Sequence, residues 1–443
     1  MTSSISQHFK PMQLIRYTMP SMIMMMFMSI YTIADGTIVS KFLGDSALSA
    51  LNIAYPVVFL VNGIGIMLGT GGSAIIAKKL GEAKDQEAKE NFSFFLFTGV
   101  VIGLILSALV FVFHAPIIRL LGATDALYQN TKLYLLISMA FAPITVLQLM
   151  FQCYFSTAGK PQYSLILTIA GGVVNVVLDL IFIGVLHMGV EGAAIATGLG
   201  QCILGFFGLF YFAWKHDGLC FVKFPVHFQT LGQACYNGSS EMVSNLANAV
   251  VTLLFNLIMI RLAGEAGVAA ITIVLYGQFL FNSLYLGFTI GVAPILSYHY
   301  GANTTDELQN VTRLSLIFIS ISSIVLALVA FLSSEFIVNV FVKPGTQTHA
   351  IACYGFALFS INYIFAGTNL FASSLFTALS DGTRSAILSF SRTLFWMVVC
   401  LLILPSLFGL TGVWLAVPVA EFLTFLLSLI FLWKYNSKFH YLR

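Results

Sequence analysis

The sequence predicts an all-α polytopic membrane protein of twelve transmembrane helices in two parallel six-helix lobes. Three observations predict this class. Of the 443 residues, 59% are hydrophobic and only 8% are charged, whereas soluble proteins carry about 25% charged residues. The charge-free stretches reach the length of about 20 residues that a spanning helix needs. The second half of the chain also repeats the pattern of the first half at a nearly constant offset.

Twelve apolar stretches are separated by linkers that hold Gly, Pro and nearly all the Lys and Arg. Their length and their lack of strict alternation exclude the strands of a membrane barrel. The predicted helices cover residues 17–40, 52–77, 92–113, 133–157, 164–186, 190–214, 238–260, 268–298, 312–333, 351–377, 387–407 and 411–433.

The basic residues predict the orientation of the chain in the membrane. A cytoplasmic N-terminus places 15 of the 20 Lys and Arg in cytoplasmic segments, as the positive-inside rule requires. Because the number of spans is even, both termini are expected in the cytoplasm. The first twenty residues lack the apolar stretch and cleavage site of a signal peptide, so the first helix should be retained.

A shift of 220 residues aligns the two halves without gaps over long stretches. The matches include Lys41 with Arg261, Asn62 with Asn282, Gly81 with Gly301, Gly189 with Gly409 and Gly192 with Gly412, and a shift of 221 pairs Phe155 with Phe376. Since each repeat holds six spans, the halves are predicted to be parallel repeats. We expect an N-lobe (1–215), a cytoplasmic linker (216–237) and a C-lobe (238–443). A cleft between two lobes suits alternating access, and no channel filter segment is present.

Four oxygen-bearing side chains are predicted to meet in the outer half of the N-lobe. Asp35 lies about two turns before the end of the first helix, and Asp179 lies near the end of the fifth, one turn after Asn175. Thr197 reaches a similar depth from the sixth helix. A carboxylate within a membrane helix is a functional candidate by default, although Asn175 and Thr197 could also be ordinary helix-packing residues.

The donor types limit what this group could bind. Oxygen ligands alone suit a proton or a hard cation such as Na⁺ rather than a transition metal. Two carboxylates that lie close together in a region of low dielectric repel each other, so the pair is expected to hold a proton near neutral pH. The sequence therefore favours H⁺ at Asp35, Asn175, Asp179 and Thr197, with Na⁺ as the alternative.

Two further acids lie in the C-lobe. Glu241 follows Asn237-Gly-Ser-Ser at the predicted start of the seventh helix, where an acid in the first turn is favoured by the helix dipole without any function. Glu421 lies about ten residues inside the twelfth helix, and its counterpart in the N-lobe is Gln201. Glu421 could contact a cationic substrate in the cleft, or it could form an ion pair with Arg392.

Other classes of protein lack support in the sequence. The six cysteines are scattered singly, which indicates neither disulfides nor a zinc site. No P-loop, HExxH or GxSxG motif occurs, so the chain is not expected to be an enzyme or an ATP-driven pump, and no cofactor is expected. A net charge of +3 without a basic patch excludes nucleic acid as a partner. We expect a monomer whose partners are small cationic molecules and the lipid bilayer.

The chain resembles the MATE family, the multidrug and toxic compound extrusion transporters, in its prokaryotic form. The resemblance covers nearly the whole chain, and its marks are Pro20 and Asp35, Asn175-Val-Val-Leu-Asp179, and Gly-Val-Glu-Gly-Ala-Ala-Ile-Ala-Thr197. It implies that Asp35, Asn175, Asp179 and Thr197 form an N-lobe cation site, and that the first helix bends at Pro20. Together with the predicted topology, it also implies a location in the inner (plasma) membrane. Some branches use an acid in the tenth helix, but that predicted helix contains none here and Asp381 falls in the following loop.

The expected function is a secondary antiporter that exports cationic, amphipathic compounds in exchange for H⁺ or Na⁺. The alternative is a lipid or lipid-linked oligosaccharide flippase of the same superfamily. A flippase would need a cationic cleft for phosphate groups, and the helices contain almost no central Lys or Arg. A membrane scaffold or receptor is a third alternative, but it would have no use for paired acids at one depth.

Overall fold

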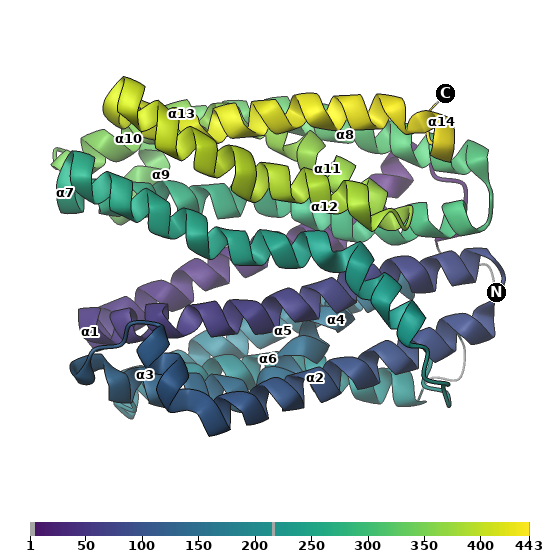
Figure 1. Ribbon diagram of the computed structural model, residues 1–443, viewed down its shortest axis with the longest axis horizontal. Coiled ribbons are helices and arrows are strands. Elements are labelled where there is room, and N and C mark those ends of the chain that lie inside the picture. The colour runs from purple at the N-terminus through teal and green to yellow at the C-terminus, as the bar shows by residue number, and fades with distance from the viewer. Residues whose placement is uncertain (1–4, 215–217, 443) are drawn as a thin grey trace.

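The computed structural model describes residues 5–214 and 218–442, and these residues form helices and no strands. Two groups of helices lie side by side, one formed by the first half of the chain and one by the second (Figure 1). The helices are α1 (Pro11–Gly81), α2 (Asp85–Leu120), α3 (Asp125–Ala140), α4 (Ala142–Thr157), α5 (Pro161–Asp179), η1 (Leu180–Val185), α6 (Val190–Trp214), α7 (Phe228–Gly301), α8 (Thr305–Leu332), α9 (Ser334–Phe341), α10 (Gln347–Phe359), η2 (Ser360–Asn362), α11 (Tyr363–Ala378), α12 (Gly382–Phe390), η3 (Ser391–Phe395), α13 (Trp396–Lys434) and α14 (Asn436–Phe439).

Two glycines turn the chain back within the long helices of the C-lobe. A straight helix of the 74 residues of α7 would measure about 110 Å, far more than the roughly 30 Å of a bilayer core. The break lies at Gly264, with φ 61° and ψ −154°, and a similar break lies at Gly409 in α13, with φ 57° and ψ −133°. Both conformations are essentially restricted to glycine. Gly189, the counterpart of Gly409 in the N-lobe, also has a positive φ of 70°.

The described residues therefore contain the predicted twelve spans. Nine helices there are long and apolar enough to cross a membrane, and α3 with α4, bent by 55°, makes a tenth. Division of α7 at Gly264 and of the α12–α13 segment at Gly409 gives twelve. Several predicted helix starts were too late in the chain: α2 begins at Asp85 rather than 92, α3 at Asp125 rather than 133, and α7 at Phe228 rather than near 238. Residues 215–217, at the predicted lobe boundary, lie outside the described residues.

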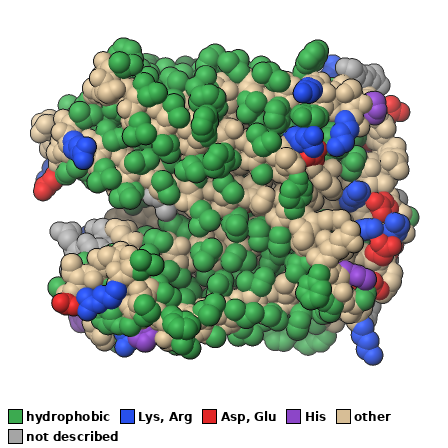
Figure 2. Space-filling view, in the orientation of Figure 1, with side chains coloured by type: hydrophobic (Ala, Val, Ile, Leu, Met, Phe, Trp, Pro, Cys, Tyr) green, Lys and Arg blue, Asp and Glu red, His purple; other side chains and the backbone are tan. Residues whose placement is uncertain are grey.

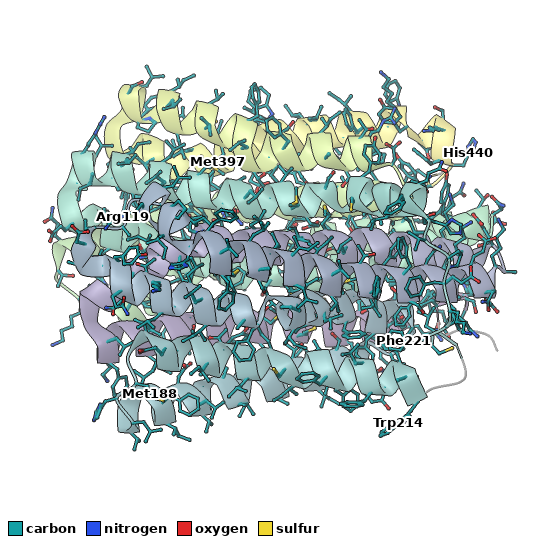
Figure 3. The ribbon with its side chains drawn as sticks, turned by 60° about the horizontal axis from the view of Figure 1, so that its bottom comes forward. Arg119, Met188, Trp214, Phe221, Met397 and His440 are labelled. Atoms are coloured by element: carbon teal, nitrogen blue, oxygen red, sulfur yellow. The ribbon has the colours of Figure 1, made fainter. Side chains whose placement is uncertain are left out.

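Charged and apolar side chains are separated along the molecule as a membrane requires. Figure 2 shows a broad hydrophobic surface over the middle of the helices, with Lys, Arg, Asp and Glu gathered toward the two ends. Both termini lie at the same end, here called the terminal end (Figure 1). In Figure 3, Trp214 and His440 lie at this end, whereas Arg119 and Met188 lie at the opposite end.

The two lobes meet closely at the terminal end and separate at the opposite end. A Cβ atom on Gly71 of α1 would lie 2.0 Å from the carbonyl oxygen of Ala234 in α7, and one on Gly81 would lie 2.0 Å from that of Tyr298. Such contacts between helix backbones need glycine. Figure 2 shows the surface hollowed between the lobes at the opposite end. The structure thus has a cleft that is open at one end and closed at the other.

Helix α1 contains two spans, Pro11–Leu43 and Ala50–Gly81, and the first of them packs against both lobes. Near its start, Leu14 and Met22 are part of a buried cluster made mainly of C-lobe residues. A Cβ atom on Gly287 of α7 would lie 2.4 Å from the Cα atom of Met22. Farther along, Phe27 and Tyr31 pack against Gly172 of α5 in the N-lobe. A movement of this span would therefore act on both lobes.

Candidate cation site

The four predicted site residues come together from three helices. Asp35 lies on α1, Asn175 and Asp179 lie one turn apart on α5, and Thr197 lies on α6. Asp179 is completely buried, and Asn175 is 3% exposed. Asp179 is also the last α-helical residue before the π-helical segment η1. Single π-helical turns of this kind occur frequently at functional sites.

The carboxyl groups of Asp35 and Asp179 lie close enough to influence each other electrostatically. No hydrogen bond of ordinary length, however, joins Asp35 Oδ1 or either carboxyl oxygen of Asp179 to another described atom. No ion pair connects either acid to a described Lys, Arg or His. Asp179 is buried and Asp35 is partly buried, so leaving both acids ionised and unpaired would be costly. The arrangement therefore favours a proton shared by the pair or a cation bound between them.

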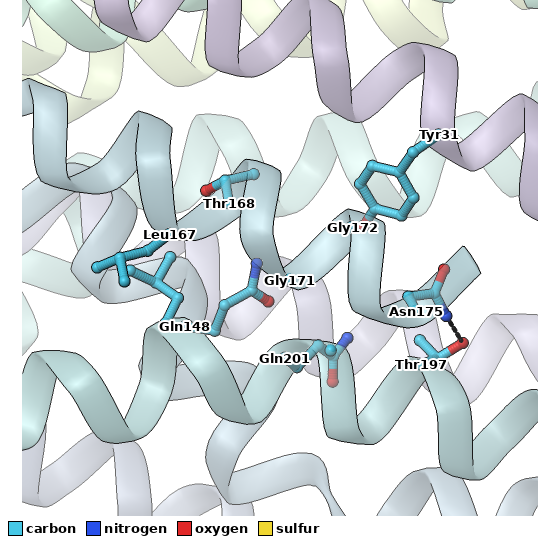
Figure 4. A pocket seen from close by; sticks show the side chains of 11 residues that line it. Tyr31, Gln148, Leu167, Thr168, Gly171, Gly172, Asn175, Thr197 and Gln201 are labelled. Carbon is cyan, nitrogen blue, oxygen red and sulfur yellow. Dashed lines mark hydrogen bonds between the residues drawn. The ribbon is translucent and has the colours of Figure 1, made fainter. Parts of the chain in front are cut away.

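Asn175 and Thr197 extend the site toward α6. Asn175 Nδ2 donates a hydrogen bond of 3.3 Å to Thr197 Oγ1, drawn in Figure 4. Asn175 Oδ1 is buried and accepts no hydrogen bond from a described atom. Unused acceptor oxygens on three side chains, Asp35, Asn175 and Asp179, with the Thr197 hydroxyl beside them, fit H⁺ or Na⁺.

A small cavity continues from Asn175 and Thr197 into the N-lobe. Its polar lining comes from the side chains of Gln148 on α4, Thr168 on α5 and Gln201 on α6. Figure 4 shows these side chains around the space between the helices. Gln148 and Thr168 were not predicted, because each is a single polar residue within an apolar helix. Gln201 was noted as the counterpart of Glu421 but not as a residue of this cavity.

The equivalent region of the C-lobe contains an ion pair. Arg392, in the π-helical segment η3, donates from Nε to Glu421 Oε1 at 2.7 Å. Asn369 Nδ2 donates to Glu421 Oε2 at 2.7 Å, and Ser428 Oγ donates to Asn369 Oδ1 at 2.9 Å. Glu421 is 1% exposed. Of the two roles considered for Glu421, the structure shows the ion pair with Arg392.

The repeat relates this ion pair to the N-lobe cavity. An offset of 220 pairs Arg392 with Gly172 and Glu421 with Gln201, and an offset of 221 pairs Asn369 with Gln148. Gly172, Gln201 and Gln148 all line the N-lobe cavity. The C-lobe thus has a guanidinium group in the region where the N-lobe has a cavity and two amides.

The interpretation of Glu241 as a helix-start residue was wrong. Because α7 begins at Phe228, Glu241 lies thirteen residues inside the helix, far from its first turn. The segment 228–237 is too polar to be recognised as part of a membrane span, but it continues the same helix. Asp381, by contrast, lies before α12, where it caps the helix and forms an ion pair with Arg384 at 2.9 Å.

Pro20 is buried within α1, nine residues after Pro11, which begins the helix. It is therefore not a helix-start residue, and its missing N–H leaves one backbone hydrogen bond unmade in the span that both lobes share.

We expect Pro20→Ala to slow transport several-fold while substrate binding is retained, because a bend at this position becomes more costly. Transport rates and binding by purified protein in vesicles measure this. A rate equal to that of the wild type would rule out Pro20 as a hinge.

Comparisons with known proteins agree with this geometry. A family model described as MatE matches the chain twice, over residues 20–181 and 242–402, once in each repeat. The multidrug export protein MepA of Staphylococcus haemolyticus is 25% identical over 437 residues, covering 98% of this chain and 95% of that protein. The protein of the same name from Staphylococcus aureus (strain N315) is 24% identical over 440 residues, covering 97% and 94%.

The fold is similar to a solved structure described as the outward-facing conformation of a multidrug resistance MATE family transporter of the MOP superfamily. The TM-score is 0.89 at 22% identity, with 96% of this chain and 95% of that chain covered. The two matches to the family model together span most of the 443 residues. The chain therefore belongs to the MATE family and is a multi-pass membrane transporter of the prokaryotic type.

Proposed function

We propose that the protein is a secondary antiporter that exports cationic, amphipathic organic compounds in exchange for H⁺, with Na⁺ as the alternative. The observation that carries this proposal is the pair formed by the buried Asp179 and the partly buried Asp35, which has no basic partner among the described residues. The names of the MepA relatives support multidrug compounds as the substrates.

The coupling needs only that the ion and the drug favour opposite states of the transporter, so that each lowers the affinity for the other. The first span of α1 supplies a physical connection, because it carries Asp35 into the N-lobe site and packs at its start in the C-lobe core. Protonation of the acid pair removes the repulsion between the two carboxylates. The preferred position of α1 then changes, and with it the width of the cleft.

The basic residues indicate that the terminal end faces the cytoplasm. In that orientation the cleft is open to the outside and closed toward the cytoplasm. This is the conformation from which an exporter releases its substrate. The lipid-flippase alternative is disfavoured, because the guanidinium of Arg392 is engaged by Glu421 rather than available to a phosphate group.

Drug efflux from vesicles under an imposed pH gradient tests the proposal. Vesicles that contain the purified protein and a fluorescent organic cation should lose the dye faster when the gradient is imposed, and vesicles with the Asp35→Asn variant should not. Dye movement that is independent of both pH and Na⁺ gradients would show a facilitator rather than an antiporter.

The Asn175→Ala variant distinguishes H⁺ from Na⁺. A proton needs one carboxylate, whereas Na⁺ needs several converging oxygens, to which Asn175 contributes Oδ1. If H⁺ drives export, Asn175→Ala should shift the pH optimum but leave an active exchanger, and added Na⁺ should have little effect. If Na⁺ drives export, the same variant should need at least about tenfold more Na⁺, the loss expected for one ligand. Efflux driven by a Na⁺ gradient alone, with the pH gradient and membrane potential collapsed, would contradict the proposal that H⁺ is the coupling ion.

A further inference from the structure

Residues 5–9, here called the anchor segment, precede α1 and are fastened to the C-lobe. Glu307, in the first turn of α8, accepts hydrogen bonds from the backbone N–H of Phe9 at 2.9 Å and from His8 Nδ1 at 2.5 Å. Asn310, one turn later, donates from Nδ2 to the carbonyl oxygen of Phe9 at 2.9 Å. The side chain of Phe9 is 1% exposed and belongs to the buried cluster made mainly of C-lobe residues. Polar and apolar contacts therefore hold the anchor segment on the C-lobe.

The start of α1 (residues 11–22) packs on the C-lobe through its backbone. Gly287 and Gly291, four residues apart on α7, face this part of α1. A Cβ atom on Gly287 would lie 2.4 Å from the Cα atom of Met22, and one on Gly291 would lie 3.1 Å from the Cα atom of Thr18. Glycines at this spacing let two membrane helices approach closely and associate tightly. The contact with the C-lobe thus continues from the anchor segment to Met22.

The start of α1 also touches the N-lobe, through hydroxyl groups. The hydroxyl of Tyr17 donates to the carbonyl oxygen of Ser156 on α4 at 2.9 Å, and the hydroxyl oxygens of Ser21 and Ser156 are 3.5 Å apart. Single hydrogen bonds between membrane helices contribute little to stability. Farther along, Ser164 on α5 donates to Met24 Sδ at 3.0 Å. The helix therefore passes from the C-lobe to the N-lobe just before Met24.

We propose that the start of α1 moves as part of the C-lobe, and that the contacts of Tyr17 and Ser21 with α4 break when the cleft opens toward the cytoplasm. This inference rests on the proposed alternation of the cleft and is independent of which ion drives export. When the lobes separate at the terminal end, the start of α1 cannot keep both sets of contacts. The anchor segment and the glycine contacts hold it on the C-lobe, whereas Met24 and later residues, including Asp35, stay with the N-lobe. The helix then bends between these two parts, close to Pro20.

Two cross-links that hold the start of α1 to different lobes test the proposal. Ser21→Cys with Ser156→Cys places two thiols where the hydroxyl oxygens are 3.5 Å apart, and oxidation of the purified protein joins α1 to the N-lobe. His8→Cys with Glu307→Cys, treated with a short bismethanethiosulfonate, joins the anchor segment to the C-lobe in place of the present contact. Each protein is reconstituted into vesicles, and efflux of rhodamine 6G, a fluorescent organic cation, is measured before and after dithiothreitol.

The two cross-links should have opposite effects. The link to the N-lobe should reduce efflux at least about tenfold, because the lobes can no longer separate at the terminal end, and dithiothreitol should restore it. The link to the C-lobe should keep efflux within about twofold of the wild type, because it replaces the anchor. Efflux that is blocked by the link to the C-lobe, or unaffected by the link to the N-lobe, would overturn the proposal.

The wild type, given both treatments, is the control for reaction of the six native cysteines. If the untreated wild type does not export rhodamine 6G, the proposed function fails. A block by the link to the C-lobe in an otherwise active exporter overturns only the inference about α1.

A single substitution tests the anchor segment if the double variants fold poorly. Glu307→Ala removes the acceptor for the N–H of Phe9, so hydrogen exchange at that amide should become faster. Efflux should slow several-fold while equilibrium binding of rhodamine 6G is retained, because the start of α1 no longer follows the C-lobe. Asp306→Ala removes the exposed neighbouring acid and should change neither exchange nor efflux. Exchange or efflux at the wild-type rate in Glu307→Ala would overturn the role of the anchor segment.

Discussion

Cells that carry Asp35→Asn or Asp179→Asn should lose drug resistance completely, with near-normal amounts of the protein in the membrane. An amide cannot exchange a proton in the physiological range, so the coupling step is removed. The amount of protein should hardly change, because neutralising a buried acid removes a desolvation cost. The amide introduced at position 179 can also donate a hydrogen bond to the Asp35 carboxylate.

The test is drug resistance and vesicle efflux at matched expression, with Glu265→Gln as a control acid on the surface. Efflux by either Asp variant should fall to the background of cells without the transporter. Asp35→Glu keeps a titratable group and should keep part of the activity. Resistance at the wild-type level in cells with Asp35→Asn or Asp179→Asn would remove these two residues from the coupling mechanism.

Most of the fold could be predicted because membrane spans are strongly marked in a sequence. The limits of α6 were predicted as Val190 and Trp214, where the structure places them. The start of α7 was missed because its first ten residues are polar enough to lie outside the bilayer, and hydropathy does not report helix that continues into water. The same error led to the wrong interpretation of Glu241.

The candidate site could be predicted less completely. The meeting of Asp35, Asn175, Asp179 and Thr197 followed from the depth of each residue along its helix. The choice between the two roles of Glu421 did not, because Arg392 and Asn369 come from other helices and only tertiary packing brings them to it. Gln148 was missed for a similar reason, since an isolated amide in an apolar helix does not reveal what it faces.

Comparison of the repeats explains why we propose ion coupling in the N-lobe rather than in the C-lobe. The C-lobe contains the positively charged side chain of Arg392, which is hydrogen-bonded to Glu421. The N-lobe has Gly172 and Gln201 at the corresponding positions and leaves Asp35 and Asp179 without a basic partner among the described residues. A site that exchanges ions must be free to lose its cation, and a cation that is covalently part of the chain cannot leave. The C-lobe pair is therefore expected to stabilise the fold rather than to couple transport.

Removal of either Arg392 or Glu421 should accordingly destabilise the folded protein strongly. Glu421→Gln leaves the Arg392 guanidinium partly buried without its partner, and loss of one partner from a buried ion pair costs about 3–5 kcal/mol. We expect much less folded protein and a clearly lower unfolding temperature in detergent. Export of every substrate should fall in proportion to the amount of folded protein.

The double variant Arg392→Met with Glu421→Gln should recover most of the stability. It removes both charges and replaces the arginine by an adaptable apolar side chain of similar length, and Asn369 Nδ2 can still donate to the new amide oxygen. Size-exclusion profiles after graded heating, on equal amounts of membrane, compare the wild type, the two single variants and the double variant. If Glu421→Gln were produced at wild-type amounts and lost only the export of dicationic drugs, Glu421 would be a substrate contact. Rescue by the second substitution cannot arise from a substrate contact, because it restores no charge to the cleft, and so it identifies the pair as structural.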